Sequence, residues 1–159
     1  MSKRIAVCPG SFDPITLGHL AIVQRAAALF DEVIIAVAED AEKRHTFGID
    51  ERVELATDAS GDIENVTVES FSGLLANYCE RRGVTAIVKG LRGHCDIDHE
   101  LQMQTVNKNL APGVETVFLM ALTEVAHISS SMVKWLASLG ADVSGYVPEN
   151  VAERLRQDV

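Results

Sequence analysis

The segment with the clearest potential for chemistry is a turn-rich stretch near the N-terminus that leads directly into a helical pattern. Residues 9–19 read Pro-Gly-Ser-Phe-Asp-Pro-Ile-Thr-Leu-Gly-His. Gly10 and Gly18 allow the backbone to approach a ligand closely, and the free N–H groups at a helix start attract phosphate. His19 could donate a hydrogen bond to a phosphate oxygen. A lone His at a helix start is more often a surface or packing residue, so a phosphate site needs further support.

Several other chemical patterns are missing. None of the 11 glycines forms a Gly-x-Gly pair, and no Gly-Lys-Ser/Thr ends a P-loop. A hydrolase triad of Ser11, Asp13 and His19 is disfavoured because no Gly-x-Ser-x-Gly elbow exists, and Asp13 is expected to fix the turn before the next proline. A protein-bound transition metal is also disfavoured, because His94 and His99 are five residues apart and fall on different faces of a helix.

The elements that must position these residues alternate between strand and helix. Continuous apolar runs predict strands over residues 5–8, 33–38, 66–68, 85–88 and 114–120. Such runs are typical of parallel strands that helices cover on both faces. Apolar spacings of three and four, with capping residues, predict helices from near Gly18 to Phe30, over 51–59 capped by Asp50, over 72–82 ended by Gly83, over 96–110, from a Ser129 cap to Gly140, and from Pro148 through Leu155.

This alternation predicts a single domain over residues 1–159, an α/β fold with a Rossmann-like, doubly wound, five-stranded parallel sheet. Ligands of such sheets bind beyond the carboxyl ends of the strands. The net charge of −9, from 14 Lys+Arg and 23 Asp+Glu, disfavours nucleic acid and anionic lipid as partners. Segments that follow two of the strands nevertheless hold six basic residues, Lys43, Arg44, His45, Lys89, Arg92 and His94. A local site for an anionic small molecule is therefore predicted.

The cysteines and the apolar runs bear on location. Cys8, Cys79 and Cys95 form no CxxC pair, so neither a disulfide framework nor a cysteine zinc site is predicted. No signal-peptide core and no apolar run of membrane-spanning length is present. We therefore expect a cytoplasmic protein without a membrane partner.

Two signatures in this sequence resemble those of the nucleotidylyltransferase superfamily. The first is Gly-Ser-Phe-Asp-Pro over residues 10–14, followed by Thr-Leu-Gly-His over residues 16–19, and the second is Ile-Ser-Ser-Ser over residues 128–131. Within the superfamily the chain is most similar to bacterial phosphopantetheine adenylyltransferases. Thr16 stands where relatives with other acceptors usually have His, and residues 89–92, Lys-Gly-Leu-Arg, match this branch.

The resemblance implies transfer of the adenylyl group of ATP to 4′-phosphopantetheine by direct in-line phosphate attack, giving dephospho-coenzyme A and pyrophosphate. This reaction is the penultimate step of coenzyme A biosynthesis. The resemblance also implies Mg²⁺ carried by ATP, coenzyme A as a feedback ligand and a homohexamer. Two alternatives stay open: a nucleotidylyltransferase with another phosphorylated acceptor, and a non-catalytic nucleotide-binding module.

The resemblance further assigns roles to individual residues. His19 would stabilise charge at the α-phosphate, Lys43 would bridge that phosphate and the acceptor, and Arg92 would reach the ATP phosphates. The implied ATP-binding residues are Ser11, Phe12, Gly18, His19, Gly90, Leu91, Arg92, Glu100, Val125, Ala126, His127, Ile128, Ser129, Ser130 and Ser131. The implied acceptor-binding residues are Ser11, Lys43, Leu75, Lys89 and Asn107.

The sequence departs from the family pattern in places. Lys89 replaces the commoner Arg, so a bidentate fork becomes a point charge. Three acids precede Lys43, and residues 96–100 and 125–127 lack the usual aromatic side chains. These changes concern adenine packing and the position of the Lys43 loop, and they remove none of the charged groups that the transfer needs.

Overall fold

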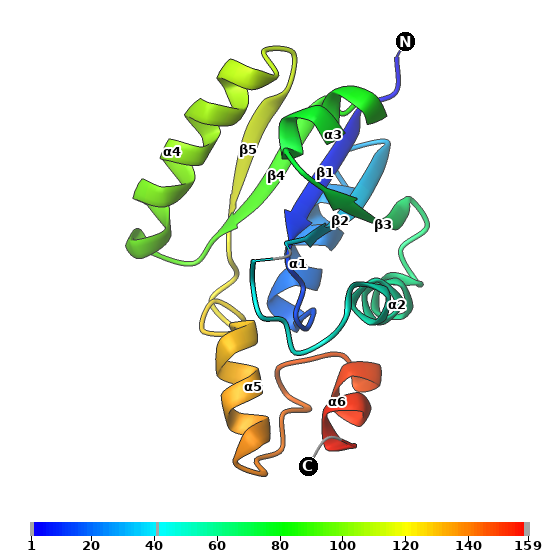
Figure 1. The fold of residues 1–159 in the computed structure, drawn as a ribbon, viewed down its shortest axis with the longest axis vertical. Coiled ribbons are helices and arrows are strands. Elements are labelled where there is room, and N and C mark those ends of the chain that lie inside the picture. The colour runs from blue at the N-terminus through cyan, green and yellow to red at the C-terminus, as the bar shows by residue number, and fades with distance from the viewer. Residues whose placement is uncertain (1, 41, 158–159) are drawn as a thin grey trace.

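The protein folds around one parallel sheet (Figure 1). The computed structural model describes residues 2–40 and 42–157, apart from the side chains of His94 and Cys95. Its strands are β1 (Ile5–Gly10), β2 (Glu32–Glu39), β3 (Val66–Ser72), β4 (Ala86–Leu91) and β5 (Glu115–Met120). They form a five-stranded sheet in the order β3-β2-β1-β4-β5, with every pair parallel. The predicted doubly wound α/β fold is confirmed.

Helices cover both faces of this sheet, as the continuous apolar strands require. Strand residues alternate between two clusters, so that Ala6 and Cys8 pack on one side while Val7 packs on the other. The first cluster includes residues of α1 (Leu17–Ala27), α2 (Ile49–Ser60), α5 (Ser130–Ser138) and α6 (Glu149–Arg156). The second includes residues of α3 (Leu75–Arg82), while α4 (His94–Leu110) contacts α3 and β5.

The order of the strands places a binding crevice between β1 and β4. The chain runs from β1 outward to β2 and β3, and then crosses to β4 on the other side of β1. Ligand sites of doubly wound sheets form at such a switch point, beyond the carboxyl ends of the strands. In Figure 1, α5 and α6 lie beyond the end of the sheet towards which β1 points. No helix in the described part of the chain is long and apolar enough to cross a membrane.

Several predicted boundaries are corrected. Helix α2 begins at Ile49 after a Gly48 N-cap, so Asp50 lies in the first turn and is not the cap. Helix α3 begins at Leu75 and not at residue 72, because β3 continues to Ser72 and Gly73, with a φ of 79°, turns the chain. Pro148 is the N-cap of α6, and α5 ends at Ser138.

Other predicted ends are confirmed. The side chain of Ser129 caps α5 by accepting a hydrogen bond from the backbone N–H of Met132, at 3.1 Å. Gly83 ends α3 in the left-handed conformation, with a φ of 65°. Strands β1, β3 and β4 extend further towards the site than the apolar runs predicted, because Pro, Gly and polar residues interrupt each apolar run before the strand ends.

Candidate active site

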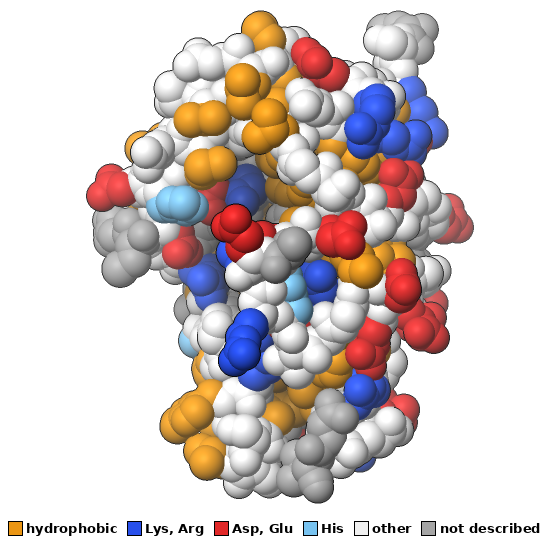
Figure 2. Space-filling model, in the orientation of Figure 1, with side chains coloured by type: hydrophobic (Ala, Val, Ile, Leu, Met, Phe, Trp, Pro, Cys, Tyr) orange, Lys and Arg blue, Asp and Glu red, His pale blue; other side chains and the backbone are white. Residues whose placement is uncertain are grey.

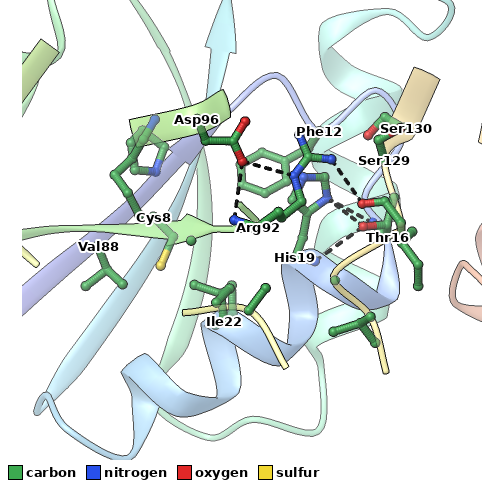
Figure 3. Close-up of a pocket in the computed structure, with 18 of the residues that line it drawn as sticks. Cys8, Phe12, Thr16, His19, Ile22, Val88, Arg92, Asp96, Ser129 and Ser130 are labelled. Atoms are coloured by element: carbon green, nitrogen blue, oxygen red, sulfur yellow. Dashed lines mark hydrogen bonds and ion pairs between the residues drawn. The ribbon is translucent and has the colours of Figure 1, made fainter. Parts of the chain in front are cut away.

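A first cavity of about 350 Å³ opens at the predicted switch point. It is bounded by the segments that follow β1 and β4 and by the first turns of α1 and α5 (Figure 3). Eleven of the residues predicted to bind ATP line it: Phe12, Gly18, His19, Gly90, Arg92, Glu100, Val125, Ile128, Ser129, Ser130 and Ser131.

Four other residues predicted to bind ATP do not line the first cavity. Ser11 lines a second, neighbouring cavity instead. Leu91 is buried, and the ring of His127 packs edge-on against Tyr146 at a centroid distance of 6.0 Å. Ala126 lines neither cavity. The structure thus gives these four side chains other surroundings, and their contact with ATP stays a prediction.

His19 is fixed in one orientation by the start of its own helix. Thr16 is the N-cap of α1, and its backbone N–H donates to His19 Nδ1 at 3.0 Å, while its hydroxyl oxygen accepts from the His19 N–H at 3.3 Å. Because Nδ1 is an acceptor, the neutral ring carries its proton on Nε2. Burial, followed by the positive charge of Arg92, lowers the pKa of His19 to about 4. At neutral pH His19 is therefore an uncharged hydrogen-bond donor.

The turn before α1 is a tight arrangement of ring and backbone. Phe12 has a φ of 47°, a left-handed conformation that is uncommon for a non-Gly residue. Its buried ring meets the His19 ring edge-on, with centroids 5.0 Å apart. A Cβ on Gly10 would lie 3.1 Å from the Phe12 ring. Gly10 thus leaves room for the Phe12 ring, and that ring packs against the His19 ring.

Gly90 has a comparable role on the opposite wall. A Cβ at this position would lie 2.9 Å from Ile22 Cγ1 of α1. The glycine therefore lets α1 approach β4 closely, which brings the start of α1 next to the end of β4. Its place in the Lys-Gly-Leu-Arg segment is explained by this close packing and by its position on the cavity wall.

Arg92 is held on two sides, which leaves part of its guanidinium open to the first cavity. Its Nη1 donates to the carbonyl of Ile128 at 3.2 Å, and its Nε lies 3.5 Å from Asp96 Oδ2. The same carboxylate accepts the backbone N–H of Arg92 at 3.3 Å. Asp96 was not predicted to matter, although its position four residues after Arg92 at the start of a helix is a signal for such a pair.

The three serines at the start of α5 differ in what they can offer a ligand. The Ser130 hydroxyl donates to the carbonyl of Pro14 at 2.8 Å, so its proton ties α5 to the turn after β1. The Ser129 hydroxyl oxygen accepts from Met132, which leaves its own proton to donate. The first N–H groups of α5 have no partner within the helix, and they favour an anion at this wall.

The second cavity, of about 540 Å³, adjoins the first and contains every predicted acceptor-binding residue. Ser11, Lys43, Leu75, Lys89 and Asn107 all line it. Apolar side chains such as Phe71, Leu74 and Met103 share the rest of its lining with polar and charged ones such as Asp40 and His99. Figure 2 shows hydrophobic side chains over the α3 and α4 region, with basic and acidic side chains gathered below them. The combination suits a long, flexible ligand with one anionic end.

Lys89 and Glu100 line both cavities and mark their junction. Lys89 Nζ lies 3.5 Å from Glu100 Oε2, and both side chains are mostly shielded from solvent.

Cys8 lies on the floor of the first cavity. Burial raises its pKa to about 12, although the positive charge of Lys89 acts in the opposite direction. Cys8 is therefore a neutral thiol, not a nucleophile, at neutral pH.

The loop that contains Lys43 is the exposed part of the site. The Lys43 side chain is 68% exposed and its Nζ lies 3.6 Å from Asp40 Oδ2. Further hydrogen bonds join Lys43 N to Asp40 O and Glu42 N to Asp40 Oδ1. The side chains of Arg44 and His45 do not line either cavity. Of the predicted basic cluster, Lys43, Lys89 and Arg92 face the site, and the side chain of His94 lies outside the described residues.

The possible metal ligands of residues 94–100 are described only in part. Within the part of the chain that the structure describes, no three His, Cys, Asp or Glu side chains gather closely enough to hold a metal ion. The side chains of His94 and Cys95 lie outside that part. Asp96 and Glu100 are each paired with a basic residue of the site.

Two residues with large effects on the shape of the site were missed or misjudged. Asp13 does more than fix a local turn, because its carboxylate accepts from the backbone N–H groups of Thr46 and Phe47 and from Lys134, each at 2.9 Å. Burial alone would raise the pKa of Asp13, but the bonds to Lys134 and to these N–H groups lower it overall. Arg52, on α2, is almost fully buried and bonds three carbonyls.

A signal for Arg52 was present in the sequence. It lies three and four residues before Leu55 and Ala56, on the buried stripe of α2, where the periodicity predicts an apolar residue. A charged residue at such a position indicates a buried hydrogen-bonding role.

Comparison with known proteins places this geometry in a family. The family described as Cytidylyltransferase-like matches residues 7–135. Phosphopantetheine adenylyltransferase of Pseudarthrobacter chlorophenolicus is 52% identical over 153 residues, which cover 96% of this chain and 92% of the relative. The enzyme of that name from Nitratidesulfovibrio vulgaris is 47% identical over 97% of this chain and 83% of its own. The chain belongs to the cytidylyltransferase-like family, in its phosphopantetheine adenylyltransferase branch.

Solved structures agree with the fold of this family. Nicotinic acid mononucleotide adenylyltransferase of Plasmodium falciparum, complexed with NaAD, superposes with a TM-score of 0.71 at 16% identity, over 98% of this chain and 96% of that one. A bifunctional NMN adenylyltransferase/ADP ribose pyrophosphatase of Francisella tularensis gives a TM-score of 0.72 at 16% identity, over 98% of this chain and 49% of that one. At such low identity the likeness supports the fold alone.

Proposed function

We propose that this protein transfers the adenylyl group of ATP to 4′-phosphopantetheine, giving dephospho-coenzyme A and pyrophosphate. The observation that carries the proposal is the pair of cavities that meet at Lys89. One is lined by a helix start, serines and Arg92, which suit phosphate, and the other combines Lys43 and Lys89 with apolar side chains of the α3 and α4 region. Relatives about half identical over nearly the whole chain bear the name of this activity.

The chemistry is a direct displacement at the α-phosphorus of ATP. An oxygen of the acceptor phosphate forms a bond to that phosphorus, and the bond to the bridging oxygen breaks, so that pyrophosphate leaves with the electron pair. Because both reactants are anions, the protein must align them and offset their repulsion. Lys43 and Lys89 would bind the acceptor phosphate at the junction, and Arg92 with the start of α5 would bind the phosphates that leave.

His19 would serve as a transition-state donor. Its Nε2–H is directed by the hydrogen bond that Thr16 makes to Nδ1, and no proton transfer is needed for the role. A donor that is fixed before the reaction stabilises the transition state more than a flexible one, because it does not have to reorient when charge develops. ATP binding would raise the pKa of His19 from its low value in the free protein, since a phosphate favours the charged ring.

We propose that Mg²⁺ enters with ATP. The carboxylates lining the first cavity, Asp96 and Glu100, are paired with Arg92 and Lys89, and this fits an ion held by the nucleotide. Mg²⁺ keeps several waters and is commonly bound through substrate phosphates. The ion would offset charge on the β- and γ-phosphates while the side chains above orient the reactants.

A homohexamer, feedback by coenzyme A and a cytoplasmic location complete the proposal. Large apolar side chains are exposed on α4 and at the end of β5, among them Leu101, Leu110 and Met120, and they would suit subunit contacts. Coenzyme A shares the pantetheine arm and would compete for the second cavity. ATP as a substrate favours the cytoplasm.

Pyrophosphate release tests the proposed reaction. The purified chain is given Mg²⁺-ATP with 4′-phosphopantetheine, nicotinamide mononucleotide, glycerol 3-phosphate or no acceptor. Release with phosphopantetheine alone, with dephospho-coenzyme A as co-product, is expected. Release only with another acceptor would keep the chemistry and overturn the substrate, and ATP binding without turnover on any acceptor would overturn the enzyme.

A further inference from the structure

Arg52 is a buried cation whose three hydrogen bonds all end on backbone carbonyls. Its side chain lies in the core beneath the site, and the whole residue is 2% exposed. Nε donates to Phe47 O at 3.1 Å, and Nη1 donates to Ser11 O at 2.7 Å and to Ala38 O at 3.0 Å. Burial of a guanidinium has a large desolvation cost, which hydrogen bonds offset only where several acceptors are arranged around the planar group.

The three carbonyls belong to the two walls of the site. Ser11 lies in the turn after β1, next to Phe12, which lines the first cavity. Ala38 is near the end of β2, where the Lys43 loop leaves the sheet, and Phe47 is where that loop returns to α2. One guanidinium therefore holds both ends of the loop and attaches them to the turn that faces the nucleotide.

The bond to Ser11 also orients a donor. The C=O and N–H of a trans peptide point in opposite directions, so a Ser11 carbonyl turned towards Arg52 turns the Phe12 N–H away from it. No hydrogen bond within residues 2–40 and 42–157 uses this N–H. It therefore remains available to a phosphate oxygen at the cavity wall.

The interior of the loop contrasts with its ends. The hydrogen bonds described for residues 40 and 42–44 stay within that stretch. At the returning end, Asp13 adds a second attachment through the N–H groups of Thr46 and Phe47. The loop is thus anchored at its base and exposed at Lys43, so the position of Lys43 depends on where the base is held.

We propose that Arg52 is a positioning residue that sets the Lys43 loop in register with the Ser11–Phe12 turn, and so places the acceptor phosphate relative to the α-phosphate of ATP. This proposal rests on the function proposed above. Arg52 touches neither cavity, and it acts through Lys43 and the Phe12 N–H. A displacement of about 1 Å between reacting groups can lower a rate about a hundredfold, so a residue that fixes their register can matter without touching substrate.

A double-mutant cycle between Arg52 and Lys43 tests the proposal. Arg52→Lys keeps the charge but loses the planar fork that reaches three segments. We expect kcat/KM for 4′-phosphopantetheine to fall about tenfold or more in this variant, with a smaller change in KM for ATP. In the Arg52→Lys/Lys43→Ala double variant we expect a combined loss of kcat/KM clearly smaller than the product of the two single losses, since coupled residues are not additive and only the path through the Phe12 N–H remains. Fully additive losses would overturn the proposal.

Asn65→Ala provides the matched control. Asn65 also ties two carbonyls, those of Ala27 and Phe30, at 2.9 and 3.0 Å, but it precedes β3 at the opposite end of the sheet from the site. Its loss should leave kcat/KM nearly unchanged and should add independently to Lys43→Ala. Equal coupling of both variants to Lys43 would assign the Arg52 effect to general loss of stability and would overturn a positioning role.

Amide hydrogen exchange supplies a readout that does not depend on catalysis. In Arg52→Lys we expect faster exchange at Thr46 and Phe47 and unchanged exchange in β1 and β4. Unchanged exchange at Thr46 and Phe47 would overturn the proposal even where the wild-type reaction is established. Absence of turnover in the wild type would instead contradict the proposed function alone. If neither Arg52→Lys nor Arg52→Gln folds at any temperature, Arg52 is a residue of the fold and the positioning role is wrong.

Discussion

The wall of the first cavity and the Lys43 loop place their key side chains in different ways. His19 is held by a reciprocal pair of bonds with Thr16 and by the Phe12 ring, whereas Lys43 is exposed and contacts Asp40, three residues away. The first arrangement is fixed before substrate arrives, and the second can move. In the proposed reaction, the group that would face developing charge is therefore preorganised, whereas the group that would meet the acceptor is exposed and can adjust.

Removing the His19 donor should have the largest effect. In His19→Asn the side-chain oxygen can still accept the Thr16 N–H, but the Nε2 donor is lost. We expect kcat to fall about a hundredfold or more, as is common for a preorganised donor, with little change in thermal stability. Steady-state kinetics and thermal melting measure the two quantities.

His19→Ala separates the two roles of the ring. It should lose activity to a similar degree and also lose stability, because the partner of the Thr16 N–H is gone. Near-normal turnover in either variant would show that His19 does not stabilise the charge that develops in the reaction.

Lys43→Ala should have a smaller effect, of about ten- to a hundredfold in kcat/KM for phosphopantetheine, because Lys89 also lines the second cavity and would still bind the proposed acceptor phosphate. Since the side chain is mostly exposed, the melting temperature should not change. Glu42→Gln, in the same loop, is the matched control and should change kcat/KM by less than about threefold, as expected for an exposed charge. Equal effects of the two substitutions would attribute the loss to loop charge in general.

Asp96→Asn should raise the Kd for the nucleotide by about three- to fivefold, because a partly exposed ion pair that holds Arg92 contributes little on its own. The carbonyl of Ile128 would still hold one edge of the guanidinium. Isothermal titration with a non-hydrolysable ATP analogue measures the change. If Asp96→Asn weakened nucleotide binding about a hundredfold, the Ile128 carbonyl alone would not hold Arg92 in place.

A pH dependence of stability is expected from His19 in the absence of any substrate. The pKa of His19 is lowered to about 4 in the folded protein, from about 6.5 in an unfolded chain. Between these values the unfolded chain binds the extra proton, so stability falls as pH drops from 6.5 towards 4, by about 1–3 kcal/mol. Chemical unfolding at several pH values, with His19→Asn as control, measures it. An identical slope in both proteins would show that His19 is not held neutral.

Much of the fold followed from pattern alone. The apolar runs predicted all five strands and their parallel arrangement, because strands covered on both faces must be continuously apolar. Boundaries were less predictable. In β3 and β4, polar residues interrupt the apolar run although the ladder continues beyond them, and Gly48 replaces Asp50 as the cap of α2 because the backbone enters that helix earlier.

The chemical groups of the candidate site can be read directly from the sequence: a glycine-rich turn before His19, serines at a helix start, and basic residues after two strands. Each of these patterns lies within a short stretch of the chain, so it is visible without knowledge of the fold. Which of these groups are held in place, paired or shared between the two cavities depends on how the chain folds. The Arg52 bonds join residues 11, 38 and 47, and the Lys89–Glu100 pair divides two cavities. Contacts between distant segments depend on how the strands are ordered and how closely the helices pack, which no short stretch of sequence encodes.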